Sequence, residues 1–265
     1  MSEVFKGTTA LVTGASSGLG EEFARQIAGR GANVVLVART ASKLEALAAE
    51  LAQAQGVRAQ ALPMDLSAAD AGRALCEELA SRGLVIDHLI NNAGFGLHGR
   101  FVKLDPARES EMLRLNMELP TALAHALLPG MVERRRGGIL NVASTGAFQP
   151  VPGMATYAAT KAYVLSLTIG LSVELRGTGV RALALCPGPV PTGFQNVAGI
   201  DIAPQHRMAV LTAAETVRRG LRAYEKGRAV IVPGTLNSLG ALGTRLVSQR
   251  MSARIAARVM GARLT

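Results

Sequence analysis

Short apolar runs alternate with helix-length segments along most of the chain. The runs are rich in Val, Leu, Ile and Ala and show little polar alternation, which is typical of strands that are covered on both faces of a parallel sheet. We expect strands over residues 8–13, 33–38, 57–64, 88–91, 139–143, 181–186 and 229–232. Strands that alternate with helices indicate βαβ units. The pattern therefore predicts an α/β protein with one Rossmann-type, doubly wound parallel sheet of about seven strands and helices on both faces.

The clearest helix signal lies over residues 42–55, where Leu44, Leu47 and Leu51 recur at three- and four-residue spacing. Ser42 is the expected N-cap of this helix, and Gly56 is expected to end it. Further helices are expected over residues 19–30, 105–136 and 157–176, and the second of these should be interrupted near Pro120.

The segment 187–204 is rich in Pro and Gly and poor in charge, so we expect a loop over the carboxyl edge of the sheet. The part from about residue 190 to 212 is expected to close on substrate. The chain has neither a Gly/Ser-rich linker nor an internal repeat. We therefore expect a dinucleotide-binding and catalytic domain over residues 1–235, followed by a basic helical tail over residues 236–265.

Composition adds limits to this prediction. A hydrophobic content of 49% is ample for a buried core. The net charge of +10 is uneven, because residues 205–265 carry eleven Lys or Arg against two acids, whereas residues 1–204 carry eighteen against seventeen. Cys76 and Cys186 lack metal-ligand spacing and form no disulfide framework, and residues 1–6 lack the apolar core of a signal peptide. We expect a cytoplasmic protein without a metal site.

A glycine-rich turn, Thr-Gly-Ala-Ser-Ser-Gly-Leu-Gly over residues 13–20, connects the first expected strand to the first helix. A pyrophosphate needs backbone N–H groups that it can approach closely and a helix N-terminus directed at it, and glycines in such a turn supply both. The turn therefore predicts a dinucleotide site, although its spacing differs from the general G-x-G-x-x-G pattern.

The residue that contacts the adenine ribose is expected about twenty positions further on, at the end of the second strand. Arg39 stands there in place of a carboxylate. Because a guanidinium can form two charge-assisted hydrogen bonds with a 2'-phosphate, Arg39 favours NADP(H) over NAD(H). Ser16, Thr40 and Lys43 are candidates for further contacts with that phosphate.

Candidate acid/base chemistry comes from Tyr157 and Lys161, whose spacing of four places them on one face of a helix. A phenol with an ordinary pKa near ~10 needs roughly 4 kcal/mol of electrostatic help to reach ~7, and a nearby ammonium can supply it. Ser144 ends the fifth strand thirteen residues earlier. Because ligands bind outside the carboxyl ends of parallel strands, we expect Ser144 and Tyr157 to converge there.

Together these motifs resemble the short-chain dehydrogenase/reductase family. The turn matches its T-G-x-x-x-G-x-G, Asp65-Leu66 its adenine-contacting pair, residues 91–94 its N-N-A-G, and residues 187–192 its P-G-x-x-x-T. Within the family the chain looks similar to the DltE-like reductases, near the 3-ketoacyl and 17-beta-hydroxysteroid type enzymes. The resemblance implies these cofactor contacts: Gly14, Ser16, Ser17, Gly18, Leu19, Gly20, Arg39, Asp65, Leu66, Asn92, Ala93, Gly94, Tyr157, Lys161, Pro187, Gly188, Val190 and Thr192.

The resemblance also implies the catalytic roles. Ser144 would orient the substrate oxygen, Tyr157 would exchange the proton, and Lys161 would lower the tyrosine pKa and hold the nicotinamide ribose. Asn116 would support a water-linked proton relay to the lysine. We therefore expect an NADP(H)-dependent oxidoreductase acting on a carbonyl or alcohol. The alternative is a catalytically silent protein on the same fold, either dinucleotide-sensing and regulatory or membrane-associated.

The expected substrate is a hydrophobic small molecule. Its pocket should be lined by Phe95, Leu97, Phe148, Val151, Met154, Phe194 and Val197, whereas His98 and His206 are weaker candidates for substrate contact.

The tail carries Arg245, Arg250, Arg254, Arg258 and Arg263 without an acid, with Val247, Met251, Ile255 and Val259 beside the arginine row. It could pack on a neighbouring subunit, remain a solvated arm, or lie on an anionic membrane surface, and the membrane is not favoured over the other two. Family habit implies a homo-oligomer, either a dimer or a tetramer. Nucleic-acid binding is not expected, because the tail lacks aromatic residues.

Overall fold

The computed structural model describes residues 3–199 and 210–259. Seven parallel strands form one sheet in the order β3-β2-β1-β4-β5-β6-β7. The strands are β1 (Thr9–Thr13), β2 (Asn33–Ala38), β3 (Ala59–Pro63), β4 (His88–Asn91), β5 (Gly138–Val142), β6 (Arg181–Leu185) and β7 (Val230–Ile231). All seven lie where the apolar runs predict them. The doubly wound fold is thus confirmed.

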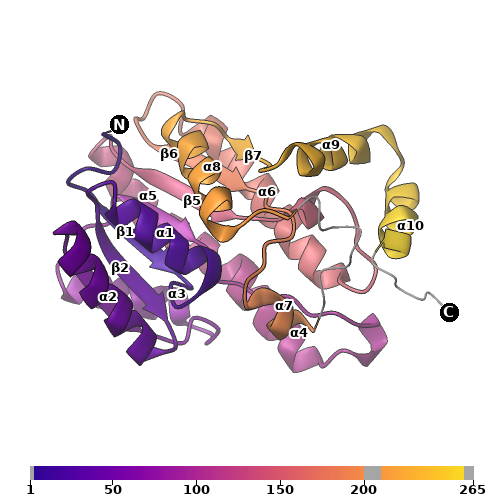
Figure 1. The fold of residues 1–265 in the computed structure, drawn as a ribbon, viewed down its shortest axis with the longest axis horizontal. Helices are drawn as coiled ribbons and strands as arrows, with labels where there is room; N and C mark the ends of the chain where they lie inside the picture. The colour runs from indigo at the N-terminus through magenta and orange to yellow at the C-terminus, as the bar shows by residue number, and fades with distance from the viewer. Residues whose placement is uncertain (1–2, 200–209, 260–265) are drawn as a thin grey trace.

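Both faces of the sheet are covered by helices (Figure 1). Side chains of α1 (Gly18–Ala28), α2 (Ala41–Gln55) and α8 (Ala213–Glu225) pack in the core cluster on one face. The other face is covered by α3 (Ala71–Ser81), α5 (Leu119–Glu133) and α6 (Ala155–Glu174). Neighbouring residues of a strand point to opposite faces, so Val12 packs in the first cluster and Leu11 in the second. Most strand positions are therefore apolar, as the sequence pattern indicates.

Two helices begin earlier than expected, and two others were not expected at all. Helix α2 begins at Ala41 with Thr40 as N-cap, so the prediction of Ser42 as N-cap was wrong. Helix α6 begins at Ala155, two residues before Tyr157. Helices α3 and α8 were not predicted, because their short apolar stripes lie among charged residues.

The expected break near Pro120 is present and has an identifiable form. Helix α4 (Pro106–Leu113) runs into a π-helical turn, η2 (Arg114–Glu118), and α5 follows directly. Pro120 lies in the first turn of α5, and because it has no N–H it cannot continue the hydrogen-bond ladder of the preceding turns. The wide turn places Asn116 in the protein interior, with 2% of its surface exposed.

Four further short elements are η1 (Phe101–Lys103), η3 (Thr145–Phe148), α7 (Phe194–Ala198) and α9 (Thr235–Gly243). After α9 the chain continues through η5 (Thr244–Leu246) into α10 (Gln249–Val259). We call residues 235–259 the C-terminal arm; it projects from the body of the molecule beside β7 (Figure 1). None of the helices in the described ranges is long and apolar enough to span a membrane.

Candidate active site

One large cleft runs along the carboxyl edge of the sheet and has a volume of about 1160 Å³. The segments that follow β1, β2, β3, β4, β5 and β6 all contribute to its lining. In a doubly wound sheet this edge is where the strand order reverses and where ligands bind. The cleft therefore lies where the sequence motifs were expected to meet.

The glycine-rich turn after β1 is shaped for close approach. Gly14 adopts a φ of +68°, a left-handed conformation that L side chains rarely adopt. At Gly20 a Cβ atom would lie 2.1 Å from the backbone oxygen of Gly14, so helix α1 can start this close to the turn only with glycine. Ser17, the N-cap of α1, makes no side-chain capping bond. The N–H groups of the first helical turn are thus directed into the cleft without a capping side chain.

Hydrogen bonds join this turn to the N-N-A-G segment after β4. The hydroxyl of Thr13 accepts from the backbone N–H groups of Asn92 and Ala93, each at 3.0 Å, and donates to the carbonyl of Ile90. The Asn92 amide in turn donates to the carbonyl of Thr13 at 2.9 Å. The glycine-rich turn and the N-N-A-G segment are therefore fixed relative to each other by hydrogen bonds. The first asparagine of that segment, Asn91, donates instead to the side chain of Asn141 within the sheet, at 2.8 Å.

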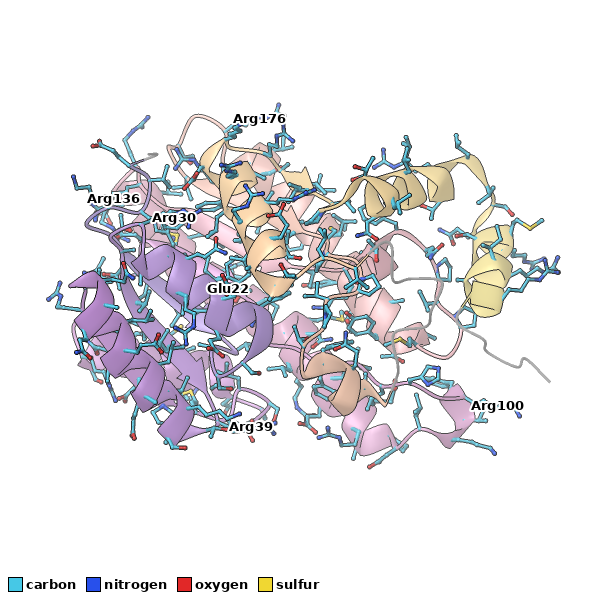
Figure 2. The ribbon with its side chains drawn as sticks, in the orientation of Figure 1. Glu22, Arg30, Arg39, Arg100, Arg136 and Arg176 are labelled. Atoms are coloured by element: carbon cyan, nitrogen blue, oxygen red, sulfur yellow. The ribbon has the colours of Figure 1, made fainter. Side chains whose placement is uncertain are left out.

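Arg39 and Asp65 lie at the outer end of the cleft, after β2 and β3. Arg39 is exposed and, among the residues that the structure describes, forms no salt bridge with a carboxylate (Figure 2). The Asp65 carboxylate accepts from the backbone N–H and the hydroxyl of Ser67, and these bonds, together with the charge of Arg39, lower its pKa. Asp65 is therefore held as a fixed anion beside a solvent-facing guanidinium.

Ser144, Tyr157 and Lys161 converge at the inner end of the cleft. Ser144 caps η3, where its hydroxyl accepts from the backbone N–H of Gly146 at 3.0 Å. Tyr157 projects from the first turn of α6, and the hydrogen bond between Ser144 and its phenol lowers the tyrosine pKa. The Lys161 ammonium lies 5.8 Å from the centre of the Tyr157 ring and donates to the carbonyl of Val142 at 2.8 Å. The predicted convergence of these residues is present.

The electrostatics of the pair differ from the sequence expectation. Burial raises the pKa of Tyr157 to about 12, and the Ser144 hydrogen bond offsets only part of that rise. Burial also lowers the pKa of Lys161 to about 8. The expected lowering of the tyrosine pKa by Lys161 stays a prediction; in this arrangement the ammonium is bonded to the Val142 carbonyl and the loss of solvation dominates the Tyr157 pKa.

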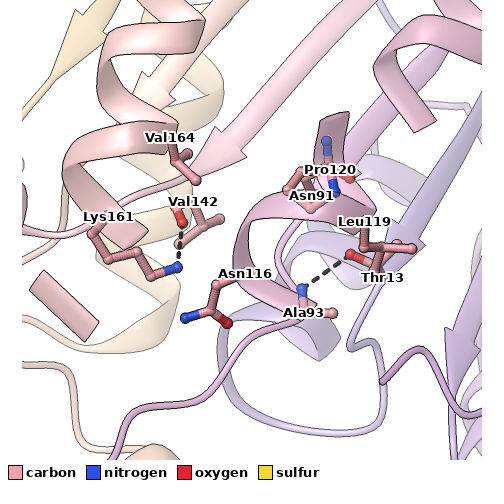
Figure 3. Close-up of a pocket in the computed structure, with 9 residues that line it drawn as sticks. All are labelled: Thr13, Asn91, Ala93, Asn116, Leu119, Pro120, Val142, Lys161 and Val164. Carbon is pink, nitrogen blue, oxygen red and sulfur yellow. Dashed lines mark hydrogen bonds between the residues drawn. The ribbon is translucent and has the colours of Figure 1, made fainter. Parts of the chain in front are cut away.

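Asn116 lies behind this trio on the π-helical turn. Its side chain accepts from the backbone N–H of Phe95 at 3.2 Å and donates to the Phe95 carbonyl at 3.0 Å and to the Thr160 hydroxyl at 3.1 Å. Asn116 and Lys161 line a small separate cavity of about 10 Å³ (Figure 3), which is about the size of one water molecule. The amide thus clamps the segment after β4 to helix α6 and leaves a small polar space next to the lysine.

The segment after β6 is held from both sides. The Pro187 carbonyl accepts from the backbone N–H of Thr145, and the Gln195 side chain donates to the Val190 carbonyl at 2.7 Å. Gln195 also accepts from the backbone N–H of Thr192 at 3.1 Å. A Cβ atom at Gly188 would lie 2.4 Å from the Asn237 side chain, so the start of the C-terminal arm packs directly on this segment.

Most residues of the expected cofactor site line the cleft. The exception is Gly20, which lies beneath the turn. Of the expected substrate-pocket residues, the following four line the cleft: Phe95, Val151, Met154 and Phe194. Phe148 does not, because its ring packs against the core cluster around Ala143 and Val164, and Leu97 is also absent from the lining. The side chain of Val197, and His206 as a whole, lie outside the described residues.

Two other groups of lining residues were not expected from the sequence. Arg108 and Glu111 line the cleft together with His98, which was a weaker candidate for substrate contact, and the Arg108 guanidinium lies 4.8 Å from the centre of the Phe95 ring. The C-terminal arm contributes ten residues: Leu236, Asn237, Gly240, Ala241, Gly243, Thr244, Val247, Ser252, Ile255 and Ala256. A hydrogen bond of 2.9 Å from Ser252 to Gln149 ties α10 to the loop after η3. The small residues of the arm could have suggested close packing, but not against which surface.

The protein has a doubly wound parallel sheet with a glycine-rich first turn, and a serine, a tyrosine and a lysine lie at the carboxyl edge of this sheet. This combination is typical of dinucleotide-dependent oxidoreductases. Residues 8–201 match the family described as short chain dehydrogenase. The chain belongs to that family.

Known relatives agree with this assignment. A short chain dehydrogenase of Pseudocercospora fijiensis is 33% identical over 86% of this chain and 73% of its own length. Among solved structures, a short-chain dehydrogenase of Sphingobium yanoikuyae in complex with NADPH is 35% identical, with a TM-score of 0.80 over 91% of this chain and 97% of that one. A 3-ketoacyl-(acyl-carrier-protein) reductase of Brucella melitensis complexed with NADH is 30% identical, with a TM-score of 0.77 over 88% of this chain and 99% of that one.

Proposed function

We propose that the protein is an NADP(H)-dependent oxidoreductase that reduces the carbonyl of a hydrophobic small molecule, or oxidises the matching alcohol, with Tyr157 as its general acid and base. One observation carries the proposal. The partly buried Tyr157 phenol is hydrogen-bonded to Ser144 and has the Lys161 ammonium behind it, and all three residues line the same cleft as the glycine-rich turn.

The residues present fit a nicotinamide dinucleotide. The turn at Gly14 and Gly18 combines positive φ angles with the absence of side chains, and the N-terminus of α1 faces the same space without a side-chain cap. The cleft-lining residues of the expected cofactor site would hold the dinucleotide from pyrophosphate to nicotinamide. When bound, the dinucleotide supplies or accepts the hydride at the substrate carbon.

Arg39 supports NADP(H) as the preferred form. Solved relatives hold either NADPH or NADH, so the choice in this chain depends on its own residue at the end of β2. The Arg39 guanidinium lies at the cleft and is not committed to a salt bridge among the described residues. It can therefore form charge-assisted hydrogen bonds with a 2'-phosphate, with Ser16 and Thr40 nearby in the lining. Lys43, the third candidate, is not part of the lining.

The proton step follows from the protonation states. With a pKa raised to about 12, Tyr157 carries its proton at neutral pH, which is the form a general acid needs for carbonyl reduction. Ser144 would donate to the same substrate oxygen and orient it. As Tyr157 gives up its proton to that oxygen, the Lys161 ammonium stabilises the negative charge that develops on the phenol.

Asn116 would act by position. Its amide holds Phe95 and Thr160, and the cavity of about 10 Å³ that it shares with Lys161 can hold a water molecule that returns a proton to the lysine. This proton route is part of the proposal.

The substrate is proposed to be large and mainly apolar. The cleft has a volume of about 1160 Å³, and Phe95, Val151, Met154 and Phe194 surround its inner end. The acyl substrate in the name of the Brucella melitensis relative is compatible with such a cleft. A panel of hydrophobic ketones, aldehydes and acyl thioesters, screened by NADPH consumption, would identify the class. A cytoplasmic location, a dimeric or tetrameric state and a domain boundary at residue 235 stay predictions.

The decisive test replaces Tyr157 by Phe. Loss of the proton donor should reduce kcat by about 10²- to 10⁴-fold, whereas NADPH binding measured by calorimetry should change little, because the ring itself remains. Tyr163→Phe is the matched control, since the Tyr163 hydroxyl bonds to Thr121 at 2.8 Å and is not part of the cleft. Turnover retained by Tyr157→Phe would rule out the assigned acid. NADPH binding by the wild type without turnover on any carbonyl would favour the silent, dinucleotide-sensing alternative.

Cofactor choice is tested by Arg39→Asp. Removing a charge-assisted contact with the 2'-phosphate should weaken NADPH binding by roughly 10- to 100-fold, with a much smaller effect on NADH. Arg58→Asp makes the same charge change at an exposed residue that is not in the cleft lining. Equal losses for the two cofactors would contradict the role given to Arg39.

A further inference from the structure

The outer face of the C-terminal arm is apolar and exposed to an unusual degree. Leu239, Leu242 and Leu246 expose 60%, 56% and 82% of their surfaces. Of the thirteen large apolar side chains that are exposed in the described part of the chain, seven lie between Leu236 and Ile255, and four of these, Leu239, Leu242, Leu246 and Met251, are not part of the cleft lining. Single exposed leucines are common, but a group of this size on one short arm indicates a surface that binds a partner.

Helix α10 adds positive charge directly beside this group. Arg250, Arg254 and Arg258 recur at four-residue spacing and are all exposed. Met251, the residue that follows Arg250, is 48% exposed and is not part of the cleft lining. Three small residues of α10, Ser252, Ala256 and Ala257, are buried. The outer side therefore combines a row of guanidinium groups with an apolar edge.

The positive charge of the arm is not balanced by acidic residues nearby in the sequence. Residues 226–265 contain no Asp or Glu, and the arm carries Arg245 in addition to the three arginines of α10. A symmetric contact between two copies of the arm would bring like charges together, which disfavours a second copy as the occupant. A wholly apolar partner would leave the guanidinium groups desolvated and unpaired. The complementary partner is one that offers both an apolar interior and a dense layer of negative charge.

We propose that the C-terminal arm docks on the surface of a lipid bilayer that contains anionic headgroups. The leucines of α9 and η5 enter the region between headgroups and acyl chains, and the arginines of α10 pair with the anionic headgroups. The arm is suited to this geometry because it projects from the body, with side chains extending outward from α9 and α10 (Figure 2). The leucines of α9 and η5 and the arginines of α10 together form the proposed docking surface of the protein.

The inner side of the same arm lines the cleft. Leu236, Ala241, Val247 and Ile255 belong to the cleft lining, and Ser252 is bonded to Gln149 near Ser144. Docking would therefore place the cleft beside the bilayer, in which a hydrophobic carbonyl substrate dissolves. This consequence rests on the proposed function, whereas lipid binding itself does not and can be measured without turnover.

The test is sedimentation of the full chain with vesicles of phosphatidylcholine alone or with about one third phosphatidylglycerol. We expect the protein to bind the mixed vesicles and not the neutral ones. Raising the salt from ~0.1 M to ~1 M shortens the screening length from about 10 to about 3 Å and should release most of the protein. Replacing Arg250, Arg254 and Arg258 by Gln should weaken the partition coefficient by about 100-fold, at about fivefold per arginine.

The matched control replaces three arginines remote from the arm, Arg58, Arg82 and Arg176, by Gln and should retain binding. A second variant, with Leu239, Leu242 and Leu246 replaced by Ser, should also lose binding, because these side chains are proposed to insert. Failure of the wild type to bind anionic vesicles, or an equal loss in the control, would overturn the proposal. Binding that needs the arginines but not the leucines would show mere electrostatic adhesion and would also overturn it. A change of oligomeric state in the leucine variant, without lipid binding by the wild type, would identify a second copy as the occupant.

Discussion

His88, at the start of β4, is expected to make the protein lose stability in weak acid. The imidazole is fully buried. Its Nε2 lies 3.1 Å from the carbonyl of Val4, which can only accept, so Nε2 carries the proton. Nδ1 lies 2.7 Å from the hydroxyl of Tyr224 and accepts from it. This arrangement stabilises the neutral ring, and burial lowers the His88 pKa from 6.5 to about 4.

The magnitude follows from linkage. Because the folded state disfavours the charged ring, the stabilising contribution is fully present above pH 6.5 and is lost as the pH falls from 6.5 towards 4. Each pH unit in this window costs about 1.4 kcal/mol, so the total loss in the free energy of unfolding is about 3 kcal/mol. Carboxylates with lowered pKa values, such as that of Asp65, add losses mainly below this window.

The assay is urea unfolding at a series of pH values between 7.5 and 4.5, on the wild type and on His88→Gln. The variant should be less stable at neutral pH, by about 1 to 3 kcal/mol, because one of the two buried partners loses its bond. Its stability should also fall less steeply with acid, since Gln does not titrate. His125→Gln, which changes an exposed histidine of α5, is the control and should follow the wild type. Parallel curves for the wild type and His88→Gln would refute the reasoning.

Two further predictions concern the frame of the cleft. Gly20→Ala would place a methyl group 2.1 Å from a backbone oxygen of the glycine-rich turn, so calorimetry should show NADPH binding weakened at least about tenfold and thermal unfolding a loss of about 1 to 3 kcal/mol. Gly170→Ala, with no atom within 4 Å, should leave both unchanged or slightly improved, and a similar loss in both variants would contradict the packing argument. Asp87→Asn should cost about 1.5 to 3 kcal/mol in urea unfolding, because this carboxylate, 3% exposed, accepts from Arg136 at 3.0 and 3.1 Å. An unchanged midpoint in Asp87→Asn would show that the ion pair adds nothing, and Asp70→Asn, in an exposed ion pair, is the control.

The pKa of Tyr157 is raised and that of Lys161 is lowered, which shows that the Tyr-x-x-x-Lys spacing alone does not predict the pKa values of its two residues. A spacing of four residues places both side chains on one helix face, as expected. Whether the ammonium acts on the phenol depends on where it finds its hydrogen-bond acceptor. Here that acceptor is the Val142 carbonyl, on a strand that is adjacent only in the folded protein.

The sequence by itself determined the sheet and the position of the site. Strand-length apolar runs that alternate with amphipathic helices leave a parallel sheet as the way to bury both faces, and the motifs after the strands must then share one edge. The glycine-rich turn, Ser144, Tyr157 and Arg39 could be placed in this way, because each is defined by its distance along the chain from a strand end. The same local logic located the break near Pro120.

Only the tertiary structure decided the features that depend on contacts between distant segments. Asn116 holds Phe95 and Thr160, Phe148 turns into the core instead of the cleft, and the basic tail folds back so that Ser252 reaches Gln149. An amphipathic pattern shows that a helix has an apolar face, but the surface against which that face packs depends on the shape and free area left by every other element. For the same reason the sequence indicated the charge of the C-terminal arm, whereas its place beside the cleft became evident only from the folded chain.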